Sequence, residues 1–154
     1  MLAACGGFLL AILWMDLIFD TQLLRHRHED ELPEAVLDSI AGYYHRATTT
    51  SRPMPHLIAA VMAILLCGSI IEIVRWQDPV WLAPVATLSA AAAIIPAAVR
   101  TVSNAVRLGG RTDTLAEQTR LARSILRDHL TSAAFMLAVV VLWSARGILA
   151  DLAR

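Results

Sequence analysis

The sequence contains no lysine, so all 13 of its basic residues are arginines. Charged residues are also scarce, at 17%, whereas 57% of the residues are hydrophobic and the mean hydropathy is +0.59. Ordinary soluble domains are about 45–50% apolar. The shortage of charge therefore excludes an ordinary soluble domain and indicates a small membrane protein that crosses the bilayer several times.

Cysteine and catalytic motifs are scarce as well. Cys5 and Cys67 are the only cysteines, so they provide neither a zinc-binding spacing nor a disulfide framework, and we interpret both as packing residues. No phosphate-binding loop, nucleophile elbow or HExxH pair occurs in the sequence. His26 and His28 lie beside acidic residues, but they would point apart on a helix, and a solvated turn is the favoured interpretation. The sequence predicts no metal and no cofactor.

Four apolar segments lie near residues 1–19, 56–74, 79–99 and 129–149. The third segment carries no charge over 21 residues, which as a helix would span about 30 Å of hydrocarbon. Backbone polar groups inside a bilayer must be satisfied, and nothing in the sequence alternates like a barrel strand. We therefore predict an all-α, four-transmembrane-helix bundle that forms a single integral membrane domain over residues 1–154.

The arginines are distributed unevenly over the loops that connect these four spans. Three lie on the opposite side of the predicted bundle: Arg75, Arg146 and Arg154. The other ten lie in the first and third loops: Arg25, Arg27, Arg46, Arg52, Arg100, Arg107, Arg111, Arg120, Arg123 and Arg127. The positive-inside rule then places both loops in the cytoplasm and both termini outside. Arginines at the inner leaflet would meet acidic lipid headgroups rather than nucleic acid. The alanine-rich, lysine-free composition is typical of a GC-rich bacterial genome, so we expect a multi-pass protein of a bacterial plasma membrane.

Both arginine-rich loops are expected to carry helix. Residues 33–46 predict an amphipathic helix that begins at Pro33 and lies along the membrane surface. Its apolar face would comprise Val36, Leu37, Ile40, Ala41 and Tyr44. In the other loop, the glycines at 109–110 indicate the end of the third helix. Thr114 and Glu117 fit a capping box that begins the fourth helix.

The first span ends with two acidic residues on one helical face, Asp16 and Asp20. An aspartate costs about 2.5–3.5 kcal/mol at the bilayer centre and less near its end, and two on one face repel each other. We therefore expect basic or polar groups to face them. The candidates after the third span and before the fourth are Arg100, Asn104, Arg107, Arg127 and His129.

Two interpretations of this convergence remain open. In the first, the residues form a polar pocket in which Asp16 and His129 are catalytic groups, and the anionic ligand is held by Asp20, Arg100, Asn104, Arg107 and Arg127. In the second, the same side chains form ion pairs that fix the helix ends, beside a solvated basic face.

The segments RTVSNAVRLGG (100–110) and ARSILRDHL (122–130) resemble the anthrone-oxygenase-like family of small four-helix membrane proteins. That family has an asparagine-x-x-leucine step after its third span and a tryptophan, asparagine and arginine motif at its fourth. The positions near these patterns are Ser103, Asn104, Leu108, Arg127 and His129. The sequence departs from the family because Arg107 precedes the leucine and His129 replaces the asparagine. The resemblance implies a cofactor-independent oxygenase precedent in some members.

The sequence favours binding or assembly within the bilayer, with acidic lipid headgroups at the arginine-rich face. Self-association into a homo-oligomer and a hydrophobic small-molecule ligand are further partner predictions. The alternative is an oxygenase-like enzyme acting on an aromatic or quinone-like substrate, with Asp16 or His129 as general base and Arg107 and Arg127 stabilising an oxyanion. A proton-coupled transporter is disfavoured because the acidic residues lie at only one end of the spans.

Overall fold

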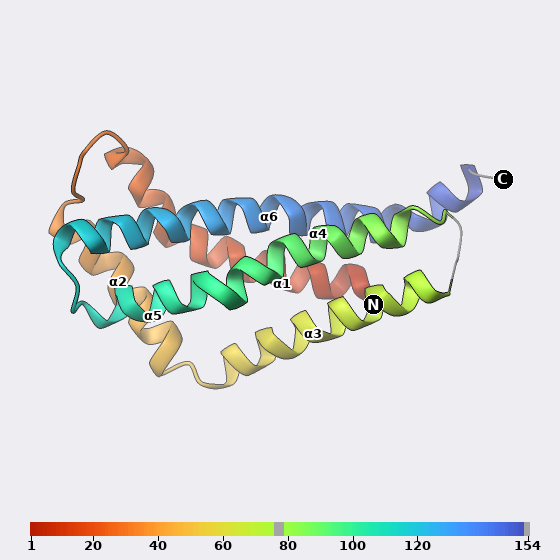
Figure 1. Cartoon of the computed structure of the whole chain (residues 1–154), viewed down its shortest axis with the longest axis horizontal. Helices are drawn as coiled ribbons and strands as arrows, with labels where there is room; N and C mark the ends of the chain where they lie inside the picture. Colours follow the sequence, from red (N-terminus) through yellow and green to blue (C-terminus); the bar gives the residue numbers. More distant parts are fainter. Residues whose placement is uncertain (76–78, 153–154) are drawn as a thin grey trace.

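The computed structural model describes residues 1–75 and 79–152, which contain helices and no strand (Figure 1). The α-helices are α1 (Leu2–Asp20), α2 (Glu34–Thr49), α3 (Pro53–Val74), α4 (Leu82–Pro96), α5 (Val102–Gly110) and α6 (Leu115–Leu152). A 3₁₀-helix, η1 (Thr21–His26), extends α1, and a π-helical turn, η2 (Ala97–Thr101), joins α4 to α5. The predicted all-α class is confirmed.

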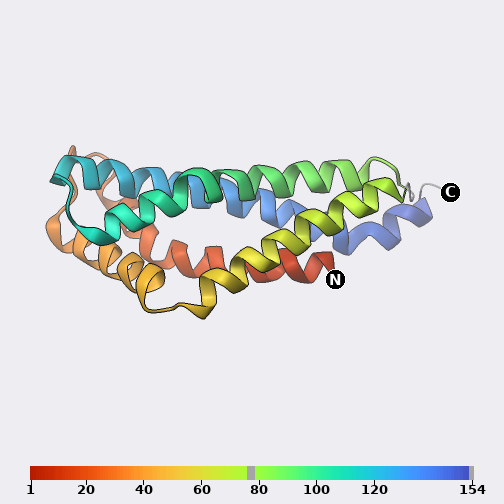
Figure 2. The same ribbon diagram turned by 60° about the horizontal axis from the view of Figure 1, so that its bottom comes forward.

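Four helical stretches of the described chain are long and apolar enough to cross a membrane: Leu2–His26, Pro53–Val74, Leu82–Gly110 and Leu115–Arg146. They run along the long axis of an elongated bundle (Figure 1, Figure 2). The predicted four-helix membrane bundle is therefore confirmed. Two of the stretches continue well beyond the apolar segments predicted from sequence, because α5 and the first turns of α6 extend the third and fourth spans into the charged end.

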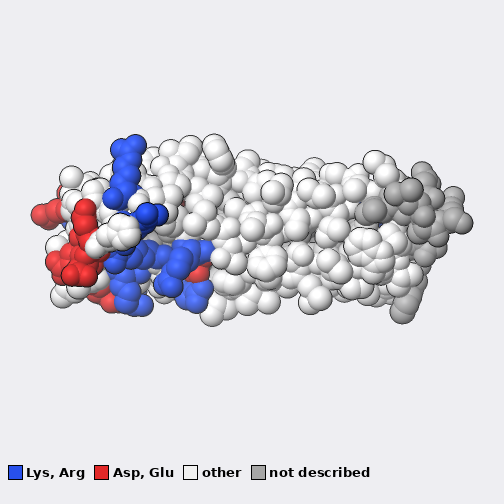
Figure 3. Space-filling view, turned by 90° about the horizontal axis from the view of Figure 1, so that it is seen from above, with Lys and Arg blue, Asp and Glu red and all other residues white. Residues whose placement is uncertain are grey.

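On the face that Figure 3 shows, charged side chains gather at one end of the molecule, and a wide uncharged belt follows. Large apolar side chains in the spanning helices face outward, among them Ile70, Leu88 and Leu137, each more than half exposed. Apolar surface of this extent is unfavourable in water and is the expected outer surface of a bundle in hydrocarbon. The exposed belt therefore agrees with a membrane-embedded bundle.

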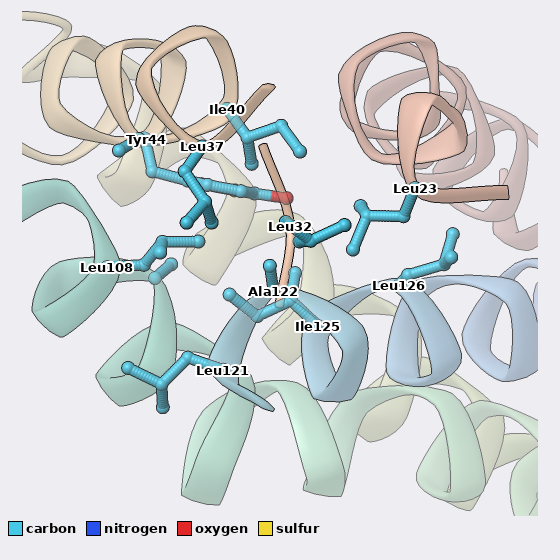
Figure 4. Packing of buried hydrophobic residues seen from close by; sticks show 12 residues of the cluster. Leu23, Leu32, Leu37, Ile40, Tyr44, Leu108, Leu121, Ala122, Ile125 and Leu126 are labelled. Atoms are coloured by element: carbon cyan, nitrogen blue, oxygen red, sulfur yellow. The ribbon is translucent and has the colours of Figure 1, made fainter. Parts of the chain in front are cut away.

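Buried apolar residues form two cores. The core of the spanning region joins α1, α3, α4 and α6 and includes Leu9, Leu65 and Met136. The core of the charged end joins α2 to η1, α5 and α6, and its fully buried members include Leu37 and Ile40 (Figure 4). The predicted amphipathic helix is thus present, and its apolar face packs on α5 and α6.

The helices α2 and α5 are in close contact at Gly109. A Cβ atom on Gly109 would lie 2.8 Å from the backbone nitrogen of His45 and 3.1 Å from its Cα. The sequence indicated a helix end at 109–110, and α5 does end at Gly110, but the left-handed residue that follows is Arg111, with a φ of 53°. Gly109 therefore serves a close helix contact and not a turn.

We expect Gly109→Ala to lower the free energy of unfolding by about 1–3 kcal/mol, because the methyl group would push α2 away from α5. Thermal unfolding in a mild detergent, followed by circular dichroism, would measure this loss. Gly110→Ala is the matched control, because a Cβ there meets nothing closer than Thr112 Oγ1 at 4.0 Å. Equal stability of the two variants would contradict the close-contact role of Gly109.

Candidate functional site

Three helices bring five polar side chains together where the spanning region meets the charged end. Asp16 and Asp20 come from the last turns of α1, Tyr43 and Tyr44 from α2, and His129 from α6. We refer to these five residues as the polar cluster. The two aspartates share a face because they are four residues apart, and the adjacent tyrosines reach one aspartate each.

Asp20 lies at the centre of the polar cluster and is completely buried. The hydroxyl of Tyr44 donates a hydrogen bond to Oδ1 of Asp20 at 2.7 Å, and Nδ1 of His129 lies 2.7 Å from Oδ2. A buried carboxylate is strongly destabilising unless its oxygens are satisfied. Both oxygens of Asp20 have a partner, so this residue acts as a clamp between α1, α2 and α6.

Asp16 is bound less completely. The hydroxyl of Tyr43 donates to Oδ1 of Asp16 at 2.5 Å, whereas Oδ2 lies 3.9 Å from Nε2 of His129, which is too long for a hydrogen bond. The ring of Phe19 stacks on that of Tyr43 with centroids 4.2 Å apart. Asp16 therefore retains an oxygen that makes no hydrogen bond to any described residue.

Two pockets meet at Asp16. One, of about 150 Å³, lies inside the bundle and is lined by Asp16, His129, Ser132 and apolar side chains. The other, of about 400 Å³, lies between α1, α2 and α3. Its polar lining residues are Asp16, Tyr43, Arg46, Thr50 and Ser51, and the others are apolar. We call the second one the Asp16 pocket. An external group that entered it would meet a carboxylate with unused hydrogen-bonding capacity.

The arginines predicted to face the aspartates pair with other carboxylates. Arg100 binds both oxygens of Asp128, with Nε 3.0 Å from Oδ2. Arg107 contacts Asp113 at 2.9 Å and Glu117 at 3.1 Å. The expected meeting of these arginines with the aspartates is therefore wrong, because each arginine pairs with an acidic residue of α6 or of the loop before it.

Of the remaining predicted residues, one meets the aspartates and two do not. His129 does meet Asp20, but Asn104 lies half-buried on α5, and Arg127 is exposed and donates only a 3.4 Å bond to the carbonyl of Arg123. In the described residues, no group of three or more histidine, cysteine, aspartate or glutamate side chains is arranged to hold a metal. The observed geometry favours the interpretation in which the acidic residues fix helix ends, with Asp16 as the group left accessible.

The sequence analysis placed Tyr44 on the apolar face of the predicted helix at 33–46, but it did not identify either tyrosine as a partner of the aspartates. Tyr44 lies on the same face of α2 as Leu37, Ile40 and Ala41, and it is buried with them. A tyrosine on a buried face needs a partner for its hydroxyl, and Asp20 is the acceptor that satisfies it. The position of Tyr44 on the apolar face was the available signal.

The environment of both phenols disfavours their ionised form. For Tyr43, burial and the hydrogen bond to Asp16 raise the pKa of the phenol. For Tyr44, burial and the negative charge of Asp20 raise the pKa of the phenol. The hydroxyls therefore remain hydrogen-bond donors to the carboxylates at any physiological pH.

Tyr44→Phe should lower the free energy of unfolding by about 1–3 kcal/mol or more, because it leaves Oδ1 of Asp20 buried without a donor. Tyr43→Phe is the matched control, since it removes the same hydroxyl from Asp16, whose side chain is 17% exposed, whereas that of Asp20 is fully buried. Denaturant unfolding in detergent micelles would compare the two. A loss for Tyr43→Phe as large as that for Tyr44→Phe would contradict the clamp assigned to Asp20.

An alkaline titration tests the same environment without a mutation, because Tyr43 and Tyr44 are the only tyrosines in the chain. Phenolate absorbance should not rise around pH 10, the ordinary pKa, while the protein remains folded. Since the unfolded state loses its phenol protons there and the folded state keeps them, stability should fall as the pH rises above about 10. Ionisation of both tyrosines near pH 10 without unfolding would rule out the raised pKa values.

Comparison with known proteins supplies the family. A family model of the SHR3 chaperone family, described as ER membrane protein SH3, matches residues 1–145. No curated protein and no solved structure matches the chain.

This match corrects two predictions made from the sequence. The resemblance to the anthrone-oxygenase-like family depended on two short segments, whereas the match covers almost the whole chain, so that assignment is wrong and the oxygenase alternative has no support. The family is one of endoplasmic reticulum membrane proteins, so the predicted bacterial plasma membrane location is wrong as well, whereas the orientation of the termini stays a prediction. The chain belongs to the SHR3 chaperone family of ER membrane proteins.

Proposed function

We propose that this protein is a chaperone of the endoplasmic reticulum membrane that binds transmembrane helices of other membrane proteins while they assemble. The family description supports both the chaperone role and the compartment. The binding or assembly role expected from the sequence has the same general character. In this proposal the whole chain acts as one membrane domain without catalytic activity, and its partner is another membrane protein.

The outer surface of the bundle supports a role in helix binding. In the most apolar stretch of α1 and of α3, only 11% of the residues are buried within the bundle, compared with 39% in α6. Both helices therefore leave large apolar side chains at the outer surface, among them Ile18 of α1 and Ile70 of α3, each more than half exposed. A client helix would pack on such a surface by van der Waals contact, as helices do in membranes.

The observation that carries the proposal is Asp16 at the edge of this surface. Its carboxylate lines a pocket between α1, α2 and α3 whose other walls are mostly apolar. Polar side chains on an unassembled transmembrane helix are costly in lipid until they find a partner. Asp16 would accept a hydrogen bond from such a group and so shield it until the client is assembled.

The two aspartates would then have separate roles. Asp20 and His129 hold α1, α2 and α6 together, and Arg100 and Arg107 stabilise the charged end through their own ion pairs. Asp16 binds the client. A homo-oligomer and a hydrophobic small-molecule ligand remain predictions from the sequence, and the proposal requires neither.

The test uses cells that lack this protein. We expect a set of multi-spanning membrane proteins to accumulate in the endoplasmic reticulum, measured by quantitative proteomics of separated membrane fractions. Wild-type protein should restore their export, whereas Asp16→Asn should restore it poorly, because losing one hydrogen bond to a charged group weakens binding by roughly tenfold or more.

Asp113→Asn is the control for this experiment, because it removes an acid of the charged end that pairs with Arg107 and lines neither pocket at Asp16. Both variants should be present at wild-type amounts. Unchanged distribution of every multi-spanning protein in the deleted cells would refute the chaperone role. Full rescue by Asp16→Asn would instead refute the role of Asp16 in binding clients.

A further inference from the structure

A second pocket lies at the charged end, on a part of the molecule that the proposed function does not use. It has a volume of about 500 Å³ and lies between the η1 region and the first turns of α6. Four arginines line it: Arg27, Arg120, Arg123 and Arg127. We call it the arginine pocket. One acidic residue, Asp30, also lines it, so the charge balance of the lining is strongly positive.

Among the described residues, Arg27, Arg123 and Arg127 have no acidic partner, whereas Arg120 has one. Arg120 is held by Glu117 at 2.7 Å. Arg123 donates to the backbone carbonyls of the loop after η1, and Arg127 donates only to the carbonyl of Arg123.

Within the described part of the chain, Arg27 donates a hydrogen bond only to the neighbouring His28, at 2.9 Å. Four arginines that converge on one pocket with fewer carboxylates beside them repel each other, and an anion in the pocket would relieve that repulsion.

The chemistry of these side chains favours a phosphate. The planar guanidinium group presents paired N–H donors that match the oxygens of a phosphate, and it remains charged at any relevant pH. A phosphomonoester carries a charge of about −1.5 to −2 and three acceptor oxygens, so it can engage several arginines at once. A zwitterionic headgroup would bring its own cation next to the arginines and would bind less well.

The position of the arginine pocket favours a lipid over a free phosphate. Basic side chains lie between the acidic tip and the uncharged belt (Figure 3), which is the depth of lipid headgroups. One face of α6 continues from Arg123 and Arg127 into the exposed apolar residues Leu130, Leu137 and Val141, all at helical spacing. A phosphate bound by the arginines would therefore have an apolar path beside it for acyl chains.

We infer that the arginine pocket binds the phosphomonoester headgroup of an acidic phospholipid, such as phosphatidic acid. The acyl chains lie along the outer face of α6. This site is separate from the Asp16 pocket, so the inference does not depend on the proposed chaperone function.

The experiment uses the full-length protein in mild detergent, with native mass spectrometry to count bound lipid during titration with phosphatidic acid. We expect one phosphatidic acid per chain at low lipid concentration, and weaker binding of phosphatidylcholine. The double variant Arg27→Gln/Arg127→Gln should weaken phosphatidic acid binding by about tenfold or more, since it removes two of the charge-assisted contacts. Among the described residues, neither side chain makes an ion pair or a hydrogen bond to another helix, so the fold should be unaffected, as thermal unfolding would verify.

The matched control is Arg25→Gln/Arg52→Gln, which removes the same charge from exposed positions outside the arginine pocket. This control should bind phosphatidic acid as the wild type does. Equal weakening in both double variants would overturn the site in favour of diffuse attraction to the charged end. Competition by inorganic phosphate at the concentration of the lipid would overturn the lipid assignment and indicate a site for free phosphate.

Discussion

A carboxylate that has no access to solvent is the constraint on which the charged end of this protein depends. Asp20 is fully buried, and it is tolerated there because Tyr44 and His129 each satisfy one of its oxygens. These partners come from helices that are distant in sequence. A shift of α1, α2 or α6 by one turn would leave the charge unpaired, so the polar cluster fixes the relative position of all three helices.

The position of α2 follows from that clamp. Tyr44 anchors it to α1, Gly109 lets it approach α5 at backbone distance, and Arg111 contacts Asp38 at 2.5 Å on its outer side. With α2 in place, Leu37 and Ile40 complete a core beyond the apolar spans. This helix therefore closes one end of the bundle, and it also supplies the Tyr43 and Arg46 walls of the Asp16 pocket.

The sequence was sufficient to predict those features that depend on the thickness of the bilayer or on the period of the α-helix. The bilayer thickness sets the length of an apolar helix, so four spans could be predicted, and helical spacing placed Asp16 and Asp20 on one face. Spacing does not say which helix lies opposite. The aspartates were therefore expected to meet arginines, whereas the structure gives them His129 and two tyrosines.

Two other differences have related causes. An amphipathic pattern shows that one face of α2 avoids water, but lipid and protein satisfy that face equally well, so its packing on α5 could not be predicted from sequence. The family assignment failed because it relied on short segments around 100–110 and 122–130, in which polar residues near membrane ends recur in unrelated proteins. The match over residues 1–145 uses the whole pattern of spans and loops.

The polar attachment of α3 to the rest of the bundle lies at one end of the helix. In the described chain, the side-chain ion pair that joins α3 to another helix is Glu72–Arg146, at 2.7 Å and far from the charged end. At the opposite end, Met54 and Ile58 of the same helix form a wall of the Asp16 pocket. Over the rest of its length, apolar side chains such as Ile58 and Leu65 hold α3 against the bundle. A small tilt of α3 about Glu72 would therefore change the width of the entrance to Asp16 at the cost of apolar packing, without breaking a polar contact between helices in the described residues.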